Sequence, residues 1–501
     1  MNYRVVDCNT HFGVLPYRDT DVSLQRLLRS MDEYGVAAAL TYSLMGLYYD
    51  FSDGNEETLK NTQNNPRLLP VATVDPRRHI GVVDEIVKRR NQGFVALRVF
   101  PDLQNWKLDS VLFRPIVREL ERLQMPLIVA CPANGSPTEL LRAVDGTTFP
   151  IIMCGIGYAN LAEALAACRE HDNLYIEVQI IDPPDALAVA VDAVGVERFV
   201  FGSNSPSCSM RASLNLVTES ELTAEQKGMI FSGNIRRLLG IPIANDRTLH
   251  LDSLFVGLPI IDVHSHFGKW PFPMRNTGVD YTLDLMKRRG ISKTILSSSL
   301  AIVYDFIEGN RRLAAAIEGY PNLMGYVTVN PNHFEASCKE LEAYLQKPNF
   351  VGVKIHPMYA RQPADSPQTR KLVQKVAEYG RPLLIHTFGQ GAPLQVLQLA
   401  RECPNLPIIM GHGGADAWRE AVYVMQQADN LFAEFCCTIH ETGKVRRSID
   451  AVGADRILFG SDLDLLHPGF IAGVYEEAGL SPDEIKKILY GNARRLFKIQ
   501  P

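Results

Sequence analysis

Short apolar runs alternate with longer segments of helical periodicity along the whole chain. In the C-terminal half, eight such runs are rich in β-branched residues, bounded by turn residues and separated by enough chain for a crossover helix. They lie near residues 260–264, 293–298, 324–329, 350–356, 382–387, 407–411, 431–436 and 456–460. The N-terminal half carries the same eight. Eight strand–helix units in roughly 250 residues predict an α/β fold of the (β/α)8 barrel type.

The two halves also repeat each other in sequence. VVDCNTHFG (5–13) returns as IIDVHSHFG (260–268), FVALRVFP (94–101) as FVGVKIHP (350–357), and SGNIRRLLGI (232–241) as YGNARRLFKI (490–499). We interpret this as a tandem duplication that predicts two barrels, residues 1–245 and 258–501, joined by a polar linker near 242–258. A doubly wound open sheet would need a Gly-rich phosphate turn after its first strand, and HSHFG does not supply one.

In a (β/α)8 barrel the chemistry belongs at the C-terminal ends of the strands. In the second half these ends carry Asp262, His264, His266, Lys354, His356, His386, His412 and Asp462. Side chains alternate along a strand, so the two histidines of His-x-His project to the same side. Three neutral imidazoles and a carboxylate suit Zn²⁺, or another borderline divalent metal, with room for water.

Composition narrows the class of partner. The 501 residues carry a formal net charge of −5, which argues against a polybasic nucleic-acid or membrane-surface protein. No apolar run is long enough for a membrane span, and the start MNYRVVDCNTHFG lacks the features of a signal peptide. The nine cysteines include no C-x-x-C pair and predict reduced thiols. We therefore expect a cytoplasmic protein that acts on a small molecule.

The second half resembles the amidohydrolase superfamily, specifically its amidohydrolase-2 branch of metal-dependent hydrolases and decarboxylases. The resemblance is carried by HSH (264–266), IHT (385–387), GHGG (411–414), FGSD (459–462) and GNARRLF (491–497), in that order. It implies that His264, His266, His386 and Asp462 are metal ligands. It also implies that His412 orients or deprotonates a metal-bound water and that Asp462 shuttles a proton.

The first half keeps one of the five matching residues. It has Asn9, His11, Ala130, Gly155 and Asn204 where the second half has His264, His266, His386, His412 and Asp462. We therefore expect the first barrel to hold no such metal. It would be a pseudo-enzyme domain that packs on the second barrel as an intramolecular pseudo-dimer, or a retired pocket that still binds something. A higher oligomer is left open.

Strand alternation makes a further prediction for the cysteines of the first barrel. Cys8, Cys131 and Cys154 each stand one position from a residue that should face inward. All three are therefore predicted to point outward into the helix layer, as buried structural thiols.

Lys354 leaves two metal stoichiometries open. A carboxylated lysine at the end of the fourth strand bridges two metals in dihydroorotase-like members of the superfamily. However, Arg98 occupies the matching place in the first barrel, which favours a structural or anion-binding role and a mononuclear Zn²⁺ centre. His356 faces the same side as Lys354 and is expected to bind substrate or to add a ligand.

Residues after the first and fourth strands of the second barrel are candidates for substrate binding. They are Trp270, Arg275, Tyr359 and Arg361, and the arginines would suit a carboxylated molecule. The favoured hypothesis is a hydrolase in which metal-activated water attacks an amide, a lactone or a related carbonyl. The alternative is a nonoxidative decarboxylase of the same branch, disfavoured by the shortness of the second barrel. A non-catalytic scaffold is the third hypothesis.

Overall fold

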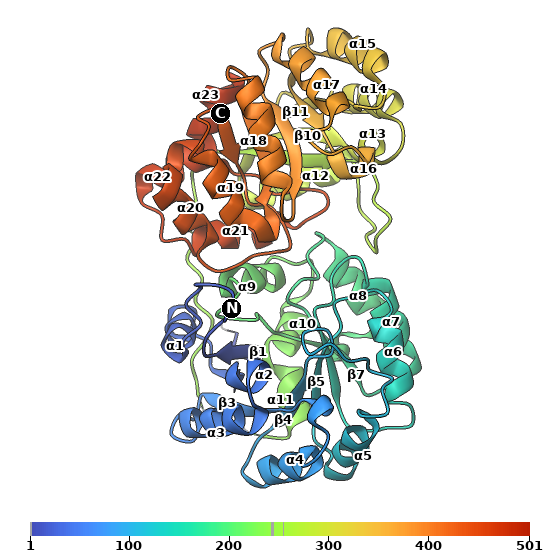
Figure 1. Cartoon of the computed structure of the whole chain (residues 1–501), viewed down its shortest axis with the longest axis vertical. Helices are drawn as coiled ribbons and strands as arrows, with labels where there is room; N and C mark the ends of the chain where they lie inside the picture. Colours follow the sequence, from blue (N-terminus) through green and yellow to red (C-terminus); the bar gives the residue numbers. More distant parts are fainter. Residues whose placement is uncertain (1–2, 242–244, 254, 501) are drawn as a thin grey trace. The chain divides into compact units, whose positions relative to one another are not determined.

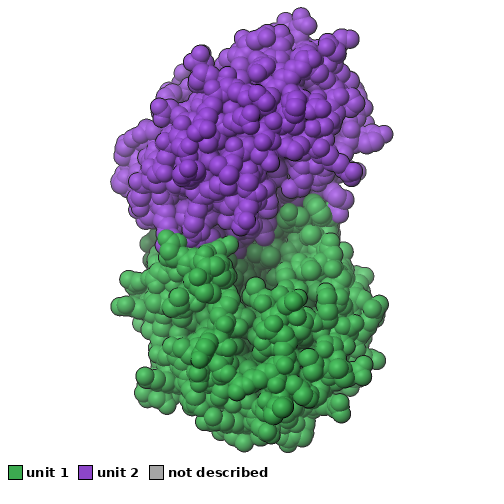
Figure 2. Space-filling model, in the orientation of Figure 1, with its two compact units in different colours: residues 1–252, 272–275 green, residues 253–271, 276–501 purple. Residues whose placement is uncertain are grey.

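The computed structural model describes residues 3–241, 245–253 and 255–500, and the chain divides into two compact units. The first unit comprises residues 1–252 with 272–275, and the second comprises 253–271 with 276–501 (Figure 2). The division falls inside the predicted linker, of which residues 242–244 and 254 lie outside the described part of the chain.

The first unit is built on eight parallel strands in sequential order (Figure 1). They are β1 Val6–Phe12, β2 Ala38–Ser43, β3 Leu68–Thr73, β4 Ala96–Val99, β5 Leu127–Ala130, β6 Ile151–Cys154, β7 Leu174–Glu177 and β8 Phe199–Val200. The chain after β8 returns to β1, because Cys8 donates its backbone N–H to the Phe201 carbonyl at 2.9 Å. Thr10 and Ser205 form a parallel bridge beyond it. The sheet is therefore a closed barrel.

The second unit repeats this plan with seven strands in sequential order. They are β9 Ile260–Phe267, β10 Ile291–Ser298, β11 Leu323–Thr328, β12 Phe350–Ile355, β13 Leu383–Phe388, β14 Ile408–Gly414 and β15 Leu431–Ala433. The expected eighth run does not form a regular strand, but it still closes the ring. Leu458 donates its backbone N–H to Ala433 at 2.9 Å, and Phe459 accepts from Val263 at 3.0 Å. The prediction of two (β/α)8 barrels is confirmed.

Helices follow the strands in both units. The first unit has α1 Leu24–Glu33, α2 Met45–Tyr48, α3 Phe51–Thr62, α4 Val82–Asn91, α5 Arg114–Leu123, α6 Ser136–Ala143, α7 Leu161–Glu170, α8 Ala186–Val194, α9 Met210–Thr218, α10 Ala224–Gly228 and α11 Asn234–Leu239. The second has α12 Val279–Arg289, α13 Ser299–Val303, α14 Phe306–Ala316, α15 Phe334–Tyr344, α16 Pro357–Ala360, α17 Pro367–Ala377, α18 Ala392–Glu402, α19 Trp418–Met425, α20 Lys444–Val452, α21 Pro468–Glu476, α22 Pro482–Lys486 and α23 Asn492–Phe497. Among the described residues, no helix has both the length and the apolar character needed to cross a bilayer.

Two apolar clusters divide the first barrel, and they correct the prediction for two of the cysteines. One cluster joins the strands to the helices and contains Cys131 as expected. The other fills the barrel interior with residues from all eight strands, and it contains Cys8 and Cys154. The prediction failed at Cys8 because β1 carries a register shift between Asp7 and Thr10, so strict alternation does not hold there.

The motif Tyr-Asp-Phe-x-x-Gly-Asn, present in both halves, locks the second helical segment against the third strand. In the second barrel, Asp305 caps α14 by accepting the backbone N–H groups of Ile307 and Glu308. Gly309 lets the helix approach closely, because a Cβ there would lie 2.3 Å from the Ala301 nitrogen. Asn310 then bonds both backbone groups of Thr328, at 3.0 and 2.9 Å. The motif is therefore structural.

Asn310→Ala should lower the free energy of unfolding by about 2–4 kcal/mol, because it leaves two buried backbone groups of Thr328 without partners. Asn55→Ala should have a similar effect on the first barrel, since Asn55 makes the same pair of bonds to Thr73. Calorimetric unfolding of the full chain measures both effects, with the exposed Asn64→Ala as the control. An unchanged unfolding profile for both buried variants would contradict this role of the motif.

Candidate metal centre

Three donor atoms converge at the C-terminal end of the second barrel. His264 and His266 come from β9, and Asp462 follows the closing segment. One ligand atom from each lies within 4.8 Å of the others, and all three side chains are buried. Asp462 Oδ1 is 2.7 Å from His266 Nε2 and 3.6 Å from His264 Nε2. The structure thus brings together three of the four predicted metal ligands.

A second buried aspartate fixes this geometry. Asp262 accepts the backbone N–H of His264 at 3.1 Å and that of Ser461 at 3.0 Å, and the Ser461 hydroxyl also donates to it. Asp462 then donates its own backbone N–H to the His264 carbonyl at 2.7 Å. Burial raises the pKa of Asp262 to about 7, although these hydrogen bonds oppose the shift. The two ligand-bearing segments are therefore held together by their backbones.

His412 and Asp462 both have left-handed backbones, with φ of 67° and 60°. Such φ values are uncommon for residues other than glycine, although aspartate and histidine adopt them more often than most, and they concentrate at functional sites. The turn at His412 also changes which side chains face inward. Gly411 faces the His264 ring, where a Cβ would lie 3.2 Å from Cε1, and the next residue still reaches the site.

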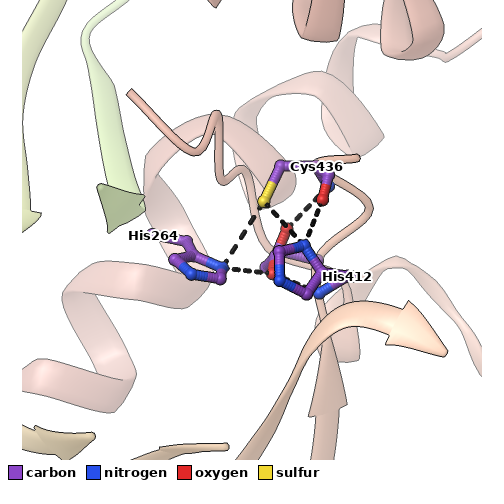
Figure 3. Close-up of side chains that lie close together, drawn as sticks. His264, His412 and Cys436 are labelled. Carbon is purple, nitrogen blue, oxygen red and sulfur yellow. Dashed lines mark hydrogen bonds and ion pairs between the residues drawn. The ribbon is translucent and has the colours of Figure 1, made fainter. Parts of the chain in front are cut away.

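Glu434 connects two of the imidazoles from the outer side. Its Oε1 lies 2.7 Å from His264 Nδ1 and accepts the His412 backbone N–H at 2.6 Å, while its Oε2 accepts the Cys436 N–H at 2.7 Å. Figure 3 shows His264, His412 and Cys436 close together, and one donor atom of each lies within 4.8 Å of a Glu434 carboxylate oxygen. Because a carboxylate accepts, His264 carries its proton on Nδ1 and presents a lone pair at Nε2.

His386 lies outside the group of three and is held by a chain of imidazoles. His412 donates from Nδ1 to the Cys436 carbonyl, which leaves its Nε2 as an acceptor. His386 Nδ1 lies 3.0 Å from that Nε2 and therefore donates to it. The remaining atom, His386 Nε2, is buried and has no hydrogen-bond partner among the described residues. His356 stacks on the His386 ring at 3.9 Å between centroids.

His266 follows the same pattern of outer contacts. Ser297 donates its hydroxyl to the Ser265 carbonyl at 3.3 Å, so it accepts from His266 Nδ1 at 3.1 Å. His266 Nε2 then turns a lone pair toward Asp462 Oδ1. That oxygen is buried and, despite the 2.7 Å approach, receives no aligned hydrogen bond. Lone pairs that face one another in a buried space are unfavourable, and a proton or a metal ion between them would relieve the repulsion.

The charge and burial of these side chains are consistent with their assignment as candidate metal ligands. Burial lowers the pKa of His266, and it holds the pKa of His264, His356 and His386 well below the ordinary value for histidine. The rings are therefore neutral, as metal ligands must be. The donor set of His264, His266, His386 and Asp462 fits a divalent metal ion.

Lys354 is fully buried within β12, and its Nζ lies 2.9 Å from His264 Nε2. Burial lowers the pKa of Lys354 to about 8, while Asp462 and Glu434 oppose the shift. The amine therefore stands beside the donor group, where the sequence placed either a bridging or an anion-binding role.

The structure separates the four candidate substrate residues. Trp270 lies against His266, with ring centroids 5.1 Å apart and planes at 89°. Tyr359 packs edge-on against His356 at 4.8 Å, and Arg361 is exposed at the end of α16. Arg275 belongs to the first compact unit, where its side chain pairs with Asp192 at 2.9 Å. Trp270 and Tyr359 thus lie next to the histidine cluster, and Arg275 is engaged elsewhere.

The first barrel keeps the backbone of the site without its donors. Asn204 and Gly155, which match Asp462 and His412, are both left-handed, with φ of 55° and 77°. Asp7 repeats the clasp of Asp262, since it accepts the backbone N–H groups of Asn9 and Ser203 at 3.0 and 3.1 Å. The first barrel therefore has the same backbone geometry as the second, although it is not expected to bind the metal.

The sequence patterns do not single out two residues of the centre, Glu434 and Cys436. Glu434 matches Glu177 of the first half, and a residue shared by both halves suggests a structural role. In the structure, Glu434 bonds His264 directly, and Cys436 Sγ lies 3.4 Å from His264 Nδ1. A glutamate kept at the same place in both halves was the available signal, but it did not reveal a contact with a ligand.

Asp462→Asn should lower metal affinity by more than about 100-fold, because the amide removes the anionic ligand of the group. The metal-free variant should be at least as stable as the parent, since asparagine tolerates the left-handed φ well. Elemental analysis and thermal unfolding of chelator-treated protein measure the two effects. Asn204→Ala, at the matching position, is the control and should leave metal content unchanged. A variant that kept its metal would exclude Asp462 as a ligand.

Glu434→Gln should weaken metal binding by about 10–100-fold while the barrel stays folded, because the amide no longer fixes the His264 tautomer as a full acceptor. Competition with a metal-sensitive dye measures the affinity. Glu177→Gln is the matched control in the first barrel, where no change is expected. Equal affinities in the parent and Glu434→Gln would show that this carboxylate serves only the fold.

Comparison with known proteins gives a family and several relatives. The amidohydrolase family model matches residues 55–241 and again 261–499. A gamma-resorcylate decarboxylase from Polaromonas sp. strain JS666 is 24% identical over 288 residues, which cover 44% of this chain and 87% of that protein. Similar structures include 2,6-dihydroxybenzoate decarboxylase with its ligand (TM-score 0.42, 20% identity, 48% of this chain and 99% of that one). Another is 5-carboxyvanillate decarboxylase from Sphingomonas paucimobilis (TM-score 0.42, 14% identity, 49% and 100%).

The family match spans most of both barrels, and the donor set of the second barrel fits a divalent metal ion. The chain therefore belongs to the amidohydrolase family.

Proposed function

We propose that the second barrel is a metal-dependent nonoxidative decarboxylase of a small hydroxylated aromatic acid. The observation that carries the proposal is the convergence of His264, His266 and Asp462 on one buried point, with unprotonated Nε2 atoms turned inward. His386 offers a further unpartnered Nε2 beside them. This arrangement supports metal chemistry on an anionic substrate, and zinc suits its nitrogen and oxygen donors.

The curated relative favours decarboxylation over the hydrolysis that sequence analysis preferred. That preference rested on the shortness of the second barrel compared with known decarboxylases. The relative named a gamma-resorcylate decarboxylase is nevertheless matched over 87% of its length. Barrel length therefore does not separate this chain from decarboxylases. Hydrolysis is the competing outcome that the experiment must test.

Some residues of the chain would bind the negative charge of the substrate, and others would contact its aromatic ring. When bound, the divalent cation would neutralise and orient the negative charge of the substrate. Trp270, edge-on to His266 at 5.1 Å, would cover the aromatic ring, and Lys354 would add positive charge beside the acid group. Glu434 holds the His264 tautomer, and Ser297 holds that of His266, so the site is oriented before substrate arrives.

The reaction balances with one proton and no net water. The bond between the ring carbon and the carboxylate breaks, carbon dioxide leaves, and the ring carbon takes up a proton drawn from solvent. Asp462 and His412 are the two groups proposed to deliver it. His412 is held by its Nδ1 contact with the Cys436 carbonyl, and Asp462 by its backbone bond to His264. Both stand at the wall of the donor cluster.

The purified full chain, loaded with Zn²⁺ or Mn²⁺, should convert 2,6-dihydroxybenzoate into resorcinol and carbon dioxide. In D₂O the product should carry one deuterium at the carbon that lost the carboxylate. Asp462→Asn and His412→Asn should each lower turnover at least about 100-fold, as expected for loss of a ligand or an acid–base group. Chromatography and mass spectrometry of the product measure these effects.

Two controls separate the outcomes. Asn204→Ala should leave turnover unchanged, because it alters only the matching position of the first barrel. A parallel panel of amides and lactones in H₂¹⁸O tests for hydrolysis through incorporation of the label into the product. Labelled product from that panel, with no carbon dioxide from a broad set of hydroxybenzoates, would reject decarboxylation in favour of hydrolysis.

A further inference from the structure

The first barrel buries a cation that has no anionic partner. Arg98, at the end of β4, is 5% exposed and forms no ion pair with any described residue. Its Nη1 donates to Asn9 Oδ1 at 2.7 Å, which is a neutral acceptor. Its Nε is buried without a hydrogen-bond partner. An uncompensated buried charge is costly, so this guanidinium requires an explanation.

The titratable groups nearest Arg98 form no ion pair with it among the described residues. Burial raises the pKa of Glu177 to about 8 and that of Cys154 to about 12, which disfavours their charged forms, although Arg98 opposes both shifts. Burial raises the pKa of Asp7 to about 7, and its oxygens already accept from Asn9 and Ser203. The guanidinium of Arg98 therefore has a neutral amide oxygen as its one direct polar partner among the described residues.

The free edge of the guanidinium has the right shape for a carboxylate. With Nη1 committed to Asn9, the remaining pair of donors is Nε and Nη2, and neither donates to a described residue. That pair is the side-on fork that binds both oxygens of a carboxylate. The Tyr42 and Phe100 rings each lie 5.2 Å from the guanidinium carbon and would suit an apolar or aromatic body attached to the acid group.

Two further features near Arg98 point to a polar site at the rim of the packed interior. His11 Nδ1 is buried without a partner, while its Nε2 is 2.7 Å from the Ser207 hydroxyl. Ala130 and Gly155, which stand where the second barrel has His386 and His412, are partly exposed. These small residues carry less side-chain bulk than the imidazoles that stand at the matching positions of the second barrel.

We propose that the first barrel binds a small, preferably aromatic, carboxylate through Arg98. The acid group would take the Nε–Nη2 edge, and the ring would lie near Tyr42 and Phe100. The first barrel is then a binding domain built on the remains of a metal site. This inference is independent of the reaction assigned to the second barrel.

The test uses the full chain and two aromatic acids. Crystals soaked in 4-bromobenzoate should show an anomalous bromine peak in the first barrel beside Arg98. In solution, titration of the full chain with ¹⁴C-benzoate should show a binding site that is lost in Arg98→Met. Lys354→Met, the matched change in the second barrel, should leave benzoate binding at this site unchanged. Arg98→Lys should weaken it at least about tenfold, because lysine lacks the fork.

Folding and anion controls make the result decisive. Arg98→Met should raise the unfolding temperature of the ligand-free first barrel, because it removes an uncompensated charge, whereas an arginine needed only for structure would lower it. Arg98→Lys is expected to fold, since the second barrel carries lysine at this position. Benzoate binding that survives in both Arg98 variants, or displacement of benzoate by equimolar chloride or phosphate, would overturn the proposal.

Discussion

The closure of each barrel by one buried aspartate is the constraint on which the rest of the structure depends. Asp262 binds the backbone of His264 and of Ser461, so the first strand and the closing segment cannot move apart without breaking its hydrogen bonds. Because Asp462 follows Ser461 directly, the hydrogen bonds of Asp262 that close the sheet also set the distance between the candidate ligands His264 and Asp462. The geometry of the candidate metal site therefore depends on the closure of the barrel.

The first barrel shows that this clasp is independent of the metal chemistry. Asp7 makes the same contacts with Asn9 and Ser203, although the neighbouring donors are gone. Asn204 and Gly155 keep the left-handed turns that Asp462 and His412 adopt in the second barrel. Asparagine and glycine adopt this conformation readily, so the first barrel retains the shape at lower conformational cost. In the second barrel the same turns present chemically active side chains.

Sequence patterns predicted the barrels and most of the site because both depend on short-range order. The eight apolar runs, the repeat and the strand-end histidines can all be read along the chain. Strict alternation failed where the backbone departs from a regular strand. The register shift between Asp7 and Thr10 lets both Cys8 and Asn9 face the barrel interior, and the left-handed turn at His412 lets two successive residues face the site. The role of Glu434 was also hidden, because its contact with His264 joins residues 170 positions apart.

At the same place in the fold, the second barrel gathers groups that would bind a cation, and the first barrel buries a cation, Arg98, without an ion-pair partner among the described residues. In the second, imidazole lone pairs and the Asp462 carboxylate converge, and a divalent cation among them would satisfy both. In the first, the donors are replaced by neutral or small residues, yet a guanidinium remains at the position of Lys354. The two sites thus differ in the ligand that would balance them: a divalent cation would pair with Asp462 in the second barrel, and a carboxylate would pair with Arg98 in the first. The same arrangement of strands would hold either ligand.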